Sequence, residues 1–208
     1  IGAVLIFDEI TSGFRENIGG IHLTYGIEPD IVIFGKALGN GFPISAIVGR
    51  REVMDSAQNS FISSTFWTER IGFVAALAAI KKMEDKNVPK HLRYYGERIN
   101  EGWKMLSQKH GIDLKISGIS ALTHLTFQTE KSLEVQTLYA QSLYEKGILL
   151  GSSVYSTYAY SNEIVDKFIG ASDTAFAQIK EALNSGNVQS YLKDDVLDTN
   201  FKRLTEPA

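Results

Sequence analysis

Three short apolar runs open the chain, and each one ends at polar residues or at glycine. They cover residues 3–7, 31–34 and 45–48 and are rich in Val and Ile. Unbroken runs of this kind are expected for strands that are buried on both faces of an α/β sheet. Ligand contacts in open α/β sheets usually come from residues just beyond the ends of such strands. The pattern therefore predicts a buried sheet with a candidate site at its strand ends.

Helical periodicity begins further along the chain. Residues 69–83 are rich in Ala and end in a Lys pair, which predicts a packed helix. Residues 89–109 predict a longer amphipathic helix with one apolar face. That face carries Leu92, Ile99, Trp103 and Leu106.

The remaining pattern alternates short apolar runs with helical stretches. The expected strands are 114–116, 122–127, 148–150 and 157–160. The expected helices are 133–146, capped by Gly147, and 161–183, with Ser161 as N-cap. This order predicts a small α+β domain after a larger α/β domain. We expect the large domain at 1–88, the small domain at 89–185 and a polar tail at 186–208.

Composition and charge narrow the classes of partner. The 208 residues are 44% hydrophobic and 22% charged, as in ordinary globular proteins. The net charge of −3 lacks the basic surplus of a nucleic-acid binder or an anionic-membrane binder. No apolar stretch approaches the ~18 residues that span a bilayer. We therefore expect neither a nucleic-acid partner nor a membrane partner.

Cysteine and histidine usage argues against disulfides and metal sites. The chain has no Cys, so nothing in it points to an oxidising compartment, and we expect a cytoplasmic protein. The four His residues show no paired metal-ligand spacing, so we expect structural or surface roles for them. Because the first residues are an apolar strand that begins with Ile, we also expect an N-terminal portion to precede it.

The segment after the first apolar run carries candidate chemistry. Adjacent strand residues point to opposite faces, so Asp8 and Glu9 are not expected to form an acid/base pair. Asp8 and Ile10 share a face instead. A carboxylate beside an aliphatic side chain suits a protonated heteroaromatic ring, although a solvated strand end has the same pattern. Glu9 is expected to be a structural carboxylate.

A lysine follows the second apolar run. Lys36 lies among glycines that allow close approach, and partial burial would make its neutral amine available as a nucleophile. A surface lysine in a glycine-rich turn remains the alternative. Two other motifs fail. A Walker A loop would need glycine at Asp30, and a dinucleotide fingerprint from Gly39 would need glycine at Ile44.

Taken together, the two segments resemble one enzyme family. The order and spacing of a set of motifs are those of the class III aminotransferases, closest to the glutamate-1-semialdehyde aminomutase branch. The motifs are Asp8-Glu9-Ile10, Gly13-Phe14-Arg15, Pro29-Asp30, Gly35-Lys36-Ala37-Leu38-Gly39, Gly41-x-Pro43 and Gly49-Arg50. The resemblance is strong over residues 3–80 and loose over most of the remainder.

The resemblance implies a fold-type I enzyme that depends on pyridoxal 5′-phosphate (PLP), with part of a large mixed-sheet α/β domain and a small C-terminal α+β domain. Lys36 matches the lysine that forms the Schiff base and moves the substrate proton. Asp8 matches the carboxylate on the ring nitrogen, and Ile10 matches the residue that packs on the ring. Thr65 matches a threonine that binds the cofactor phosphate of the neighbouring subunit. A homodimer with the active site at its interface is therefore expected.

The implied activity is amino transfer between an amine or amino-acid donor and a carbonyl acceptor. An aminomutase, a racemase or a decarboxylase of the same family would use the same Lys36 and Asp8. Many members carry Gln at the position of Thr11, and His at that of Tyr160, so the substrate stays open. Arg15 could bind a substrate carboxylate or be structural. A different interpretation is a truncated, non-catalytic fragment or interaction module.

Overall fold

The computed structural model describes residues 2–151 and 153–198. The chain divides into two compact units. Unit 1 comprises the residues up to Tyr95 with the short segments Ile119–Ala121 and Ser156–Ala159. Unit 2 comprises Gly96–Gly118, Leu122–Tyr155 and the described residues from Tyr160 onward. The domain boundary expected at residue 88 coincides with the start of a helix that contributes to both units, and this boundary stays a prediction.

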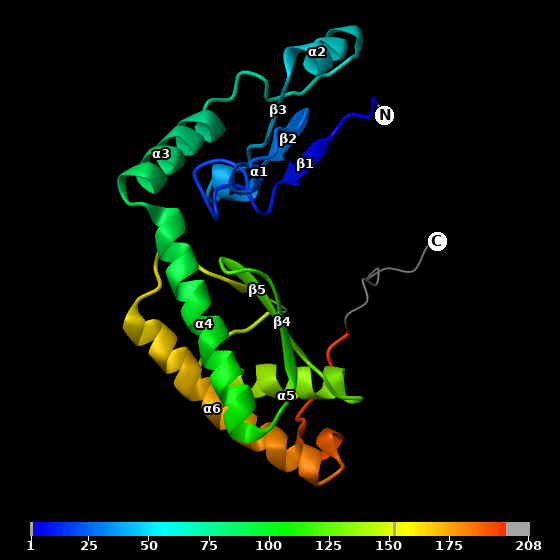
Figure 1. Ribbon diagram of the computed structural model, residues 1–208, viewed down its shortest axis with the longest axis vertical. Coiled ribbons are helices and arrows are strands. Elements are labelled where there is room, and N and C mark those ends of the chain that lie inside the picture. Colours follow the sequence, from blue (N-terminus) through cyan, green and yellow to red (C-terminus); the bar gives the residue numbers. More distant parts are fainter. Residues whose placement is uncertain (1, 152, 199–208) are drawn as a thin grey trace. The chain divides into compact units, whose positions relative to one another are not determined.

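Unit 1 is built on a three-stranded sheet of order β1-β2-β3 (Figure 1). The strands are β1 (Ile6–Glu9), β2 (Ile31–Phe34) and β3 (Ala46–Gly49). β1 and β2 are parallel, with Asp8 opposite Ile33, and β3 is antiparallel to β2. The sequence-based strand positions are thus confirmed to within a few residues.

Five short or medium helices complete unit 1. They are α1 (His22–Tyr25), η1 (Lys36–Leu38), α2 (Arg51–Met54), η2 (Asp55–Asn59) and α3 (Ile71–Asp85). A small apolar cluster of Phe14, Leu38 and Ala76 joins the glycine-rich turns to α3. A second cluster, Val88 and Leu92 with Ala121, lies at the start of α4.

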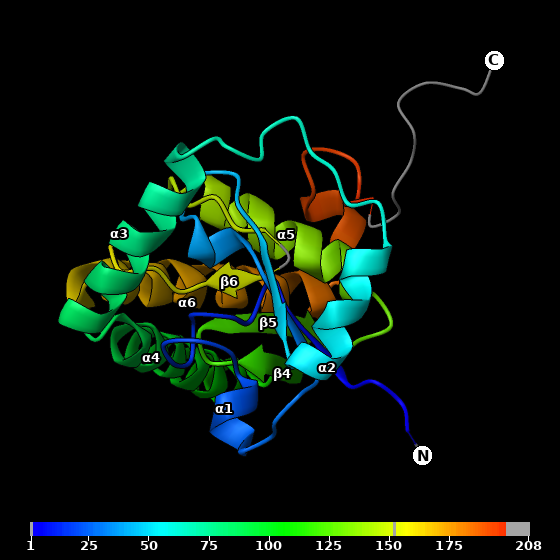
Figure 2. The ribbon, with the colours of Figure 1, turned by 90° about the horizontal axis from the view of Figure 1, so that it is seen from above.

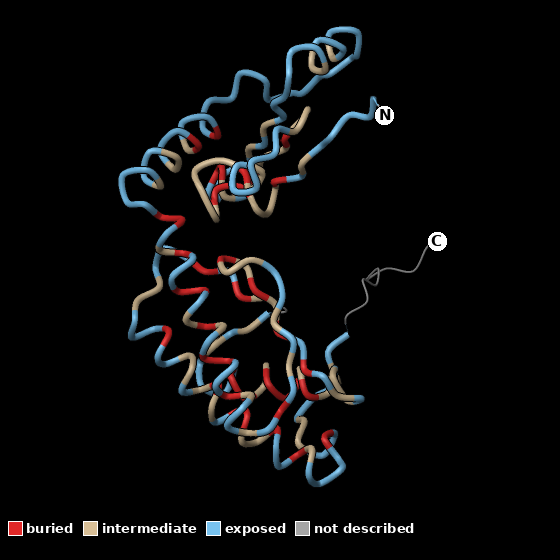
Figure 3. Tube along the Cα trace, viewed as in Figure 1, coloured by how far each residue is buried: buried red, intermediate tan, exposed pale blue. Residues whose placement is uncertain are grey.

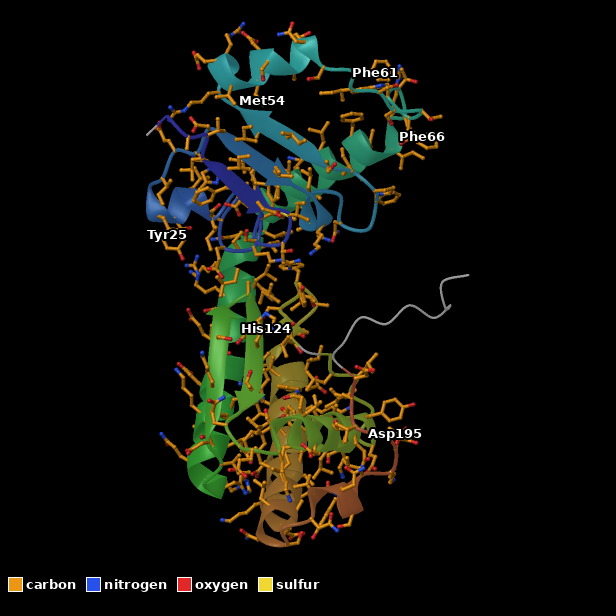
Figure 4. All side chains as sticks on the ribbon, turned by 90° about the vertical axis from the view of Figure 1, so that its right-hand side faces the viewer. Tyr25, Met54, Phe61, Phe66, His124 and Asp195 are labelled. Atoms are coloured by element: carbon orange, nitrogen blue, oxygen red, sulfur yellow. The ribbon has the colours of Figure 1, made fainter. Side chains whose placement is uncertain are left out.

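The sheet of unit 1 is less buried than its apolar sequence predicts. Ile6 is 53% exposed and Ile47 is 59% exposed, so the expectation of strands buried on both faces is wrong for this chain. These exposures are those of this chain by itself, in which few side chains pack on the strand positions. Large apolar side chains are also exposed on α3 and on the segment before it, where Figure 4 labels Phe61 and Phe66.

Unit 2 packs three helices on a second three-stranded sheet of order β4-β5-β6. Its elements are α4 (Val88–His110, shared with unit 1), β4 (Leu114–Ile119), β5 (Leu122–Phe127), α5 (Ser132–Tyr144), β6 (Val154–Tyr155), α6 (Asn162–Asn184) and η3 (Val188–Tyr191). β6 is antiparallel to β5 and lies beside it (Figure 2). Gly102 of α4 lets that helix approach Ile169 of α6, because a Cβ there would lie 2.8 Å from the isoleucine side chain.

An aromatic core holds unit 2 together. Trp103, Phe127, Tyr139 and Phe176 are each at most 2% exposed, and the rings of the last three contact one another. The Trp103 indole donates to the Tyr139 hydroxyl at 2.8 Å, and that hydroxyl pairs with Ser172 at 2.8 Å. Burial raises the pKa of Tyr139 to about 12 although both hydrogen bonds oppose it. Figure 3 shows this run of buried positions along α4, α5 and α6.

The helices of unit 2 follow the sequence pattern closely. Ser161 accepts a hydrogen bond from the Ile164 amide, which confirms it as the N-cap of α6. Gly147 has φ of +75° just after α5, in the left-handed region that glycine adopts without strain. Among the described residues, no helix combines the length and the apolar character needed to cross a membrane.

Two details of unit 2 differ from expectation. Residues 148–150 and 157–160 do not form strands, and β6 lies between them at Val154–Tyr155. Leu149 is 88% exposed, so an apolar triplet alone was a misleading signal. The supposed polar tail begins with η3, whose Val188 is 1% exposed, so this part of the tail belongs to the core. Residues 199–208 lie outside the described residues.

Candidate active site

The candidate site lies at the carboxyl ends of the parallel strands β1 and β2. Asp8 is the third residue of β1, and Lys36 follows the end of β2 after Gly35. Because β1 and β2 are parallel and in register, both ends lie at the same edge of the sheet. The carboxyl edge is where ligands bind in open α/β sheets. The fold therefore brings the two principal candidates to one edge.

Lys36 reaches toward the turn that follows β1. Its Nζ donates a hydrogen bond to the Thr11 hydroxyl at 2.6 Å. The lysine backbone has φ of +43°, a left-handed conformation that costs energy for a residue with a side chain. Gly35 before it is buried, and a Cβ on it would lie 3.4 Å from Ile10. Ile10 therefore packs against the backbone that carries the lysine.

Asp8 stays at the surface of the turn. Its Oδ1 accepts a hydrogen bond from the Ile10 amide at 3.0 Å, and the residue is exposed. The neighbouring Glu9 is 1% exposed, so the two carboxylates lie on opposite sides of β1 as the strand alternation predicts. Asp8, Ile10 and Lys36 thus place a carboxylate, an aliphatic side chain and a primary amine at one edge of the sheet.

Glu9 is a buried structural carboxylate, as expected. It accepts hydrogen bonds from the Ser12 hydroxyl at 2.5 Å and from the His22 amide at 3.0 Å. The His22 ring Nδ1 lies 3.1 Å from the same carboxylate. Burial raises the pKa of Glu9, but the hydrogen bonds from Ser12, from the Ile21 and His22 amides and from the His22 ring outweigh it and lower the pKa. Glu9 therefore ties the loop after β1 to the sheet.

Arg15 supports the same loop. Its Nε donates to the Thr11 backbone carbonyl at 2.6 Å. The next residue, Glu16, binds Arg93 at 3.1 Å, and its backbone carbonyl accepts from the same guanidinium. This placement gives Arg15 a structural contact, which was one of its two expected roles. The Thr11–Lys36 contact was missed by the sequence reasoning, because it depends on how the turn folds back toward β2.

Thr65 lies away from these contacts along the chain, in an exposed segment of turns before α3. The helix begins at Ile71, later than the sequence suggested. Glu69 accepts from the Ile71 amide at 2.8 Å and lies 3.5 Å from the Gly72 amide. The Glu69 carboxylate therefore satisfies the first amides of α3. The assignment of Thr65 stays a prediction.

The histidines occupy structural or surface positions. His22 contacts Glu9, His91 packs on Tyr95 and Tyr158, and His110 lies 2.6 Å from Asp173. Across residues 2–151 and 153–198, no group of three or more His, Asp or Glu side chains is placed to hold a metal ion.

Comparison with known proteins gives a consistent result. The model of the family described as aminotransferase class-III matches residues 1–167. A 2′-deamino-2′-hydroxyneamine transaminase from Streptomyces kanamyceticus is 30% identical, over 82% of this chain and 44% of its own length. A glutamate-1-semialdehyde 2,1-aminomutase from Persephonella marina is 28% identical, over 86% of this chain and 46% of its own length.

Solved structures agree with the sequence relatives. The PLP internal aldimine form of a Sphingopyxis sp. FumI protein superposes with a TM-score of 0.83 at 26% identity, over 88% of this chain and 45% of that one. The chain thus spans somewhat less than half the length of the relatives it matches. Proteins of this family use PLP as their cofactor. The chain belongs to the class III aminotransferase family and has the fold-type I architecture.

Proposed function

We propose that the protein containing this chain is a PLP-dependent aminotransferase that moves an amino group between an amine or amino-acid donor and a carbonyl acceptor. The observation that carries the proposal is the hydrogen bond from the Lys36 amine to Thr11, at the sheet edge that also holds Asp8 and Ile10. The residues present fit the cofactor, because they offer one carboxylate, one aliphatic side chain and one primary amine at one edge of the sheet.

Each residue has a separate part in this proposal. When bound, PLP supplies an electron sink for charge that develops at the substrate Cα. Lys36 Nζ would carry the cofactor and would move the proton at that carbon. The Asp8 carboxylate would pair with the protonated ring nitrogen, and Ile10 would cover the ring. Thr65 is proposed to bind the phosphate group of the cofactor that the neighbouring subunit holds. The active form is therefore a homodimer in this proposal.

The substrates are small molecules in this proposal, and the protein is cytoplasmic. The relatives named above act on 2′-deamino-2′-hydroxyneamine and on glutamate-1-semialdehyde, according to their names. An aminomutase is the second candidate function, because aminomutases recur among the relatives at 26–31% identity. Lys36 and Asp8 would have the same roles in either reaction.

The first experiment tests whether Lys36 bears the cofactor. The full-length gene product is incubated with PLP, reduced with borohydride and digested, and the modified peptides are identified by mass spectrometry. We expect the label on Lys36 and a visible absorption band that an amine donor bleaches. Lys36→Ala should lose both, whereas Lys104→Ala, which changes an exposed lysine of α4, should keep both. A wild-type protein that carries no label on Lys36 would refute the proposal.

Adding amines and carbonyl compounds separately then distinguishes the two candidate reactions. A transaminase leaves the amino group on the protein-bound cofactor until an acceptor arrives, so bleaching by the donor persists. An aminomutase returns the amino group to the same carbon skeleton, so an isomerised product forms without any second substrate.

A further inference from the structure

The flexible end of Lys36 is held by one short hydrogen bond. The distance from its Nζ to the Thr11 hydroxyl is 2.6 Å, and the lysine is otherwise an exposed residue. A free lysine side chain samples many rotamers, and fixing it costs conformational entropy. The contact with Thr11 restricts the amine to the neighbourhood of the Thr11 hydroxyl. Thr11 therefore determines the position of the Lys36 amine in this structure.

Thr11 can do this because its own turn is fixed at several points. Ser12, the next residue, donates its hydroxyl to the buried Glu9 carboxylate. The Gly13 amide donates to the Glu9 carbonyl at 2.8 Å, and a Cβ on Gly13 would lie 2.6 Å from that oxygen. Arg15 donates to the Thr11 carbonyl itself. A hydroxyl on such a turn is a rigid partner, which is what precise positioning of a reactive group needs.

The base of the lysine is fixed as well. Gly35 is buried against Ile10, and η1 starts at Lys36 with a left-handed backbone. The Lys36 carbonyl accepts from the amides of Gly39 and Asn40 at 3.2 and 3.0 Å. With the backbone held in this way, the remaining conformational freedom of Lys36 is that of its long side chain. The hydrogen bond to the Thr11 hydroxyl restricts the rotamers of that side chain.

We propose that Thr11 is a positioning residue, whose hydroxyl holds the Lys36 amine at the turn after β1 so that the amine meets the cofactor at the sheet edge. The role of this contact in cofactor binding rests on the proposed function. The hydrogen bond itself is a separate claim about this chain. An experiment without cofactor can therefore judge it independently.

The test measures how reactive Lys36 is toward a small acylating reagent. Cofactor-free protein is treated with a trace of acetic anhydride, and the acetylation rate of Lys36 is compared by mass spectrometry with that of Lys104, an exposed lysine on α4. Thr11→Val removes the hydroxyl and keeps the shape. Thr11→Ser keeps the hydroxyl. Thr24→Val is the matched control, because it removes the hydroxyl of another threonine of unit 1, one that accepts a hydrogen bond from Asn17 at 2.8 Å.

While Lys36 Nζ donates to the Thr11 hydroxyl, its side chain is held against the turn, and this restricts the directions from which a reagent can reach the nitrogen lone pair. We expect Thr11→Val to raise the Lys36 to Lys104 ratio by about threefold to tenfold, the range for loss of one hydrogen bond. Thr11→Ser should stay within about twofold of the wild type, since its hydroxyl can still pair. Thr24→Val should leave the ratio unchanged. An unchanged ratio in Thr11→Val, or an equal rise in Thr11→Ser, would refute the claim that the Thr11 hydroxyl holds the Lys36 amine.

A second measurement separates this inference from the proposed function. The same variants of the full-length protein are incubated with PLP and borohydride, and the share of label on Lys36 is measured. Thr11→Val should reduce that share at least threefold while Thr11→Ser retains it. Equal shares in wild type and Thr11→Val would overturn the positioning role. If wild type carries no label on Lys36, the proposed function fails and the positioning role fails with it, whereas the acetylation ratio still decides the contact.

Discussion

The two units of this chain are stabilised in different ways. Unit 2 buries aromatic rings around a hydrogen-bonded trio, Trp103, Tyr139 and Ser172, and its core residues are nearly inaccessible. Unit 1 has small apolar clusters, and its most deeply buried large side chain is the carboxylate of Glu9. The comparison teaches that the candidate edge of unit 1 is held by polar contacts within turns, whereas the densely packed unit 2 gains its stability from apolar burial.

Removing an aromatic ring from unit 2 should give the largest effect. Phe176 is 0% exposed and contacts both Phe127 and Tyr139, so Phe176→Ala should cost about 3–5 kcal/mol of the free energy of unfolding. Leu38→Ala in the small cluster of unit 1 should cost about 2 kcal/mol, because partly exposed neighbours can close the space. Hydrogen exchange resolved by peptide measures each unit in turn. Equal losses in the free energy of unfolding would mean that the apolar cores of the two units contribute alike to stability.

An intermediate effect is expected from the buried carboxylate of unit 1. Glu9→Gln replaces a charged acceptor of several hydrogen bonds and should destabilise unit 1 by about 1.5–3 kcal/mol. The lowered pKa of Glu9 means that its stabilisation is complete above the ordinary glutamate pKa and is lost as pH falls through the lower folded value.

The pH dependence of unfolding also tests whether the ionised Glu9 carboxylate stabilises unit 1. Unfolding of unit 1 should become easier on acidification below about pH 4, and the Glu9→Gln variant should show a flatter profile. Urea titrations across this pH range, read by exchange in peptides of unit 1, give the measurement. A parallel pair of profiles would show that Glu9 is not the group responsible.

The smallest effect should come from an exposed carboxylate of unit 2. Asp173 also has a lowered pKa, caused first by the hydrogen bond from His110 and then by the one from Lys109. Its side chain is 35% exposed, so solvent screens the pair. Asp173→Asn should cost about 0.2–1 kcal/mol, and added salt should reduce the difference. A loss as large as that of Glu9→Gln would break the distinction between buried and exposed carboxylates.

The helices were the most predictable part of the fold. Leu92, Ile99, Trp103 and Leu106 are all buried along α4, because their spacing places them on one face. Ser161 capped α6 as its hydroxyl suggested. The strand at Val154–Tyr155 was not found, since a two-residue strand leaves no period to recognise.

The candidate site was predictable in its residue types and less so in its contacts. The positions of Lys36 and Asp8 followed from the strand ends and from the family motifs. The contact between Thr11 and Lys36 joins two residues that are 25 positions apart in the sequence. No local sequence pattern predicts a contact over that separation. The contact of Glu69 with the first amide of α3 was also missed, because α3 begins at Ile71, two residues later than the sequence predicted.

The left-handed backbone of Lys36 sets a trade-off for this chain. At φ of +43°, glycine would fit without strain, and Lys36→Gly would relieve about 1 kcal/mol. Selection for folding alone would therefore favour glycine at this position, whereas most other side chains would keep the strain. If Lys36 has the proposed role, the position is one where reactivity is kept at a cost in stability. Directed evolution toward heat resistance, without a demand for activity, should erase this residue early.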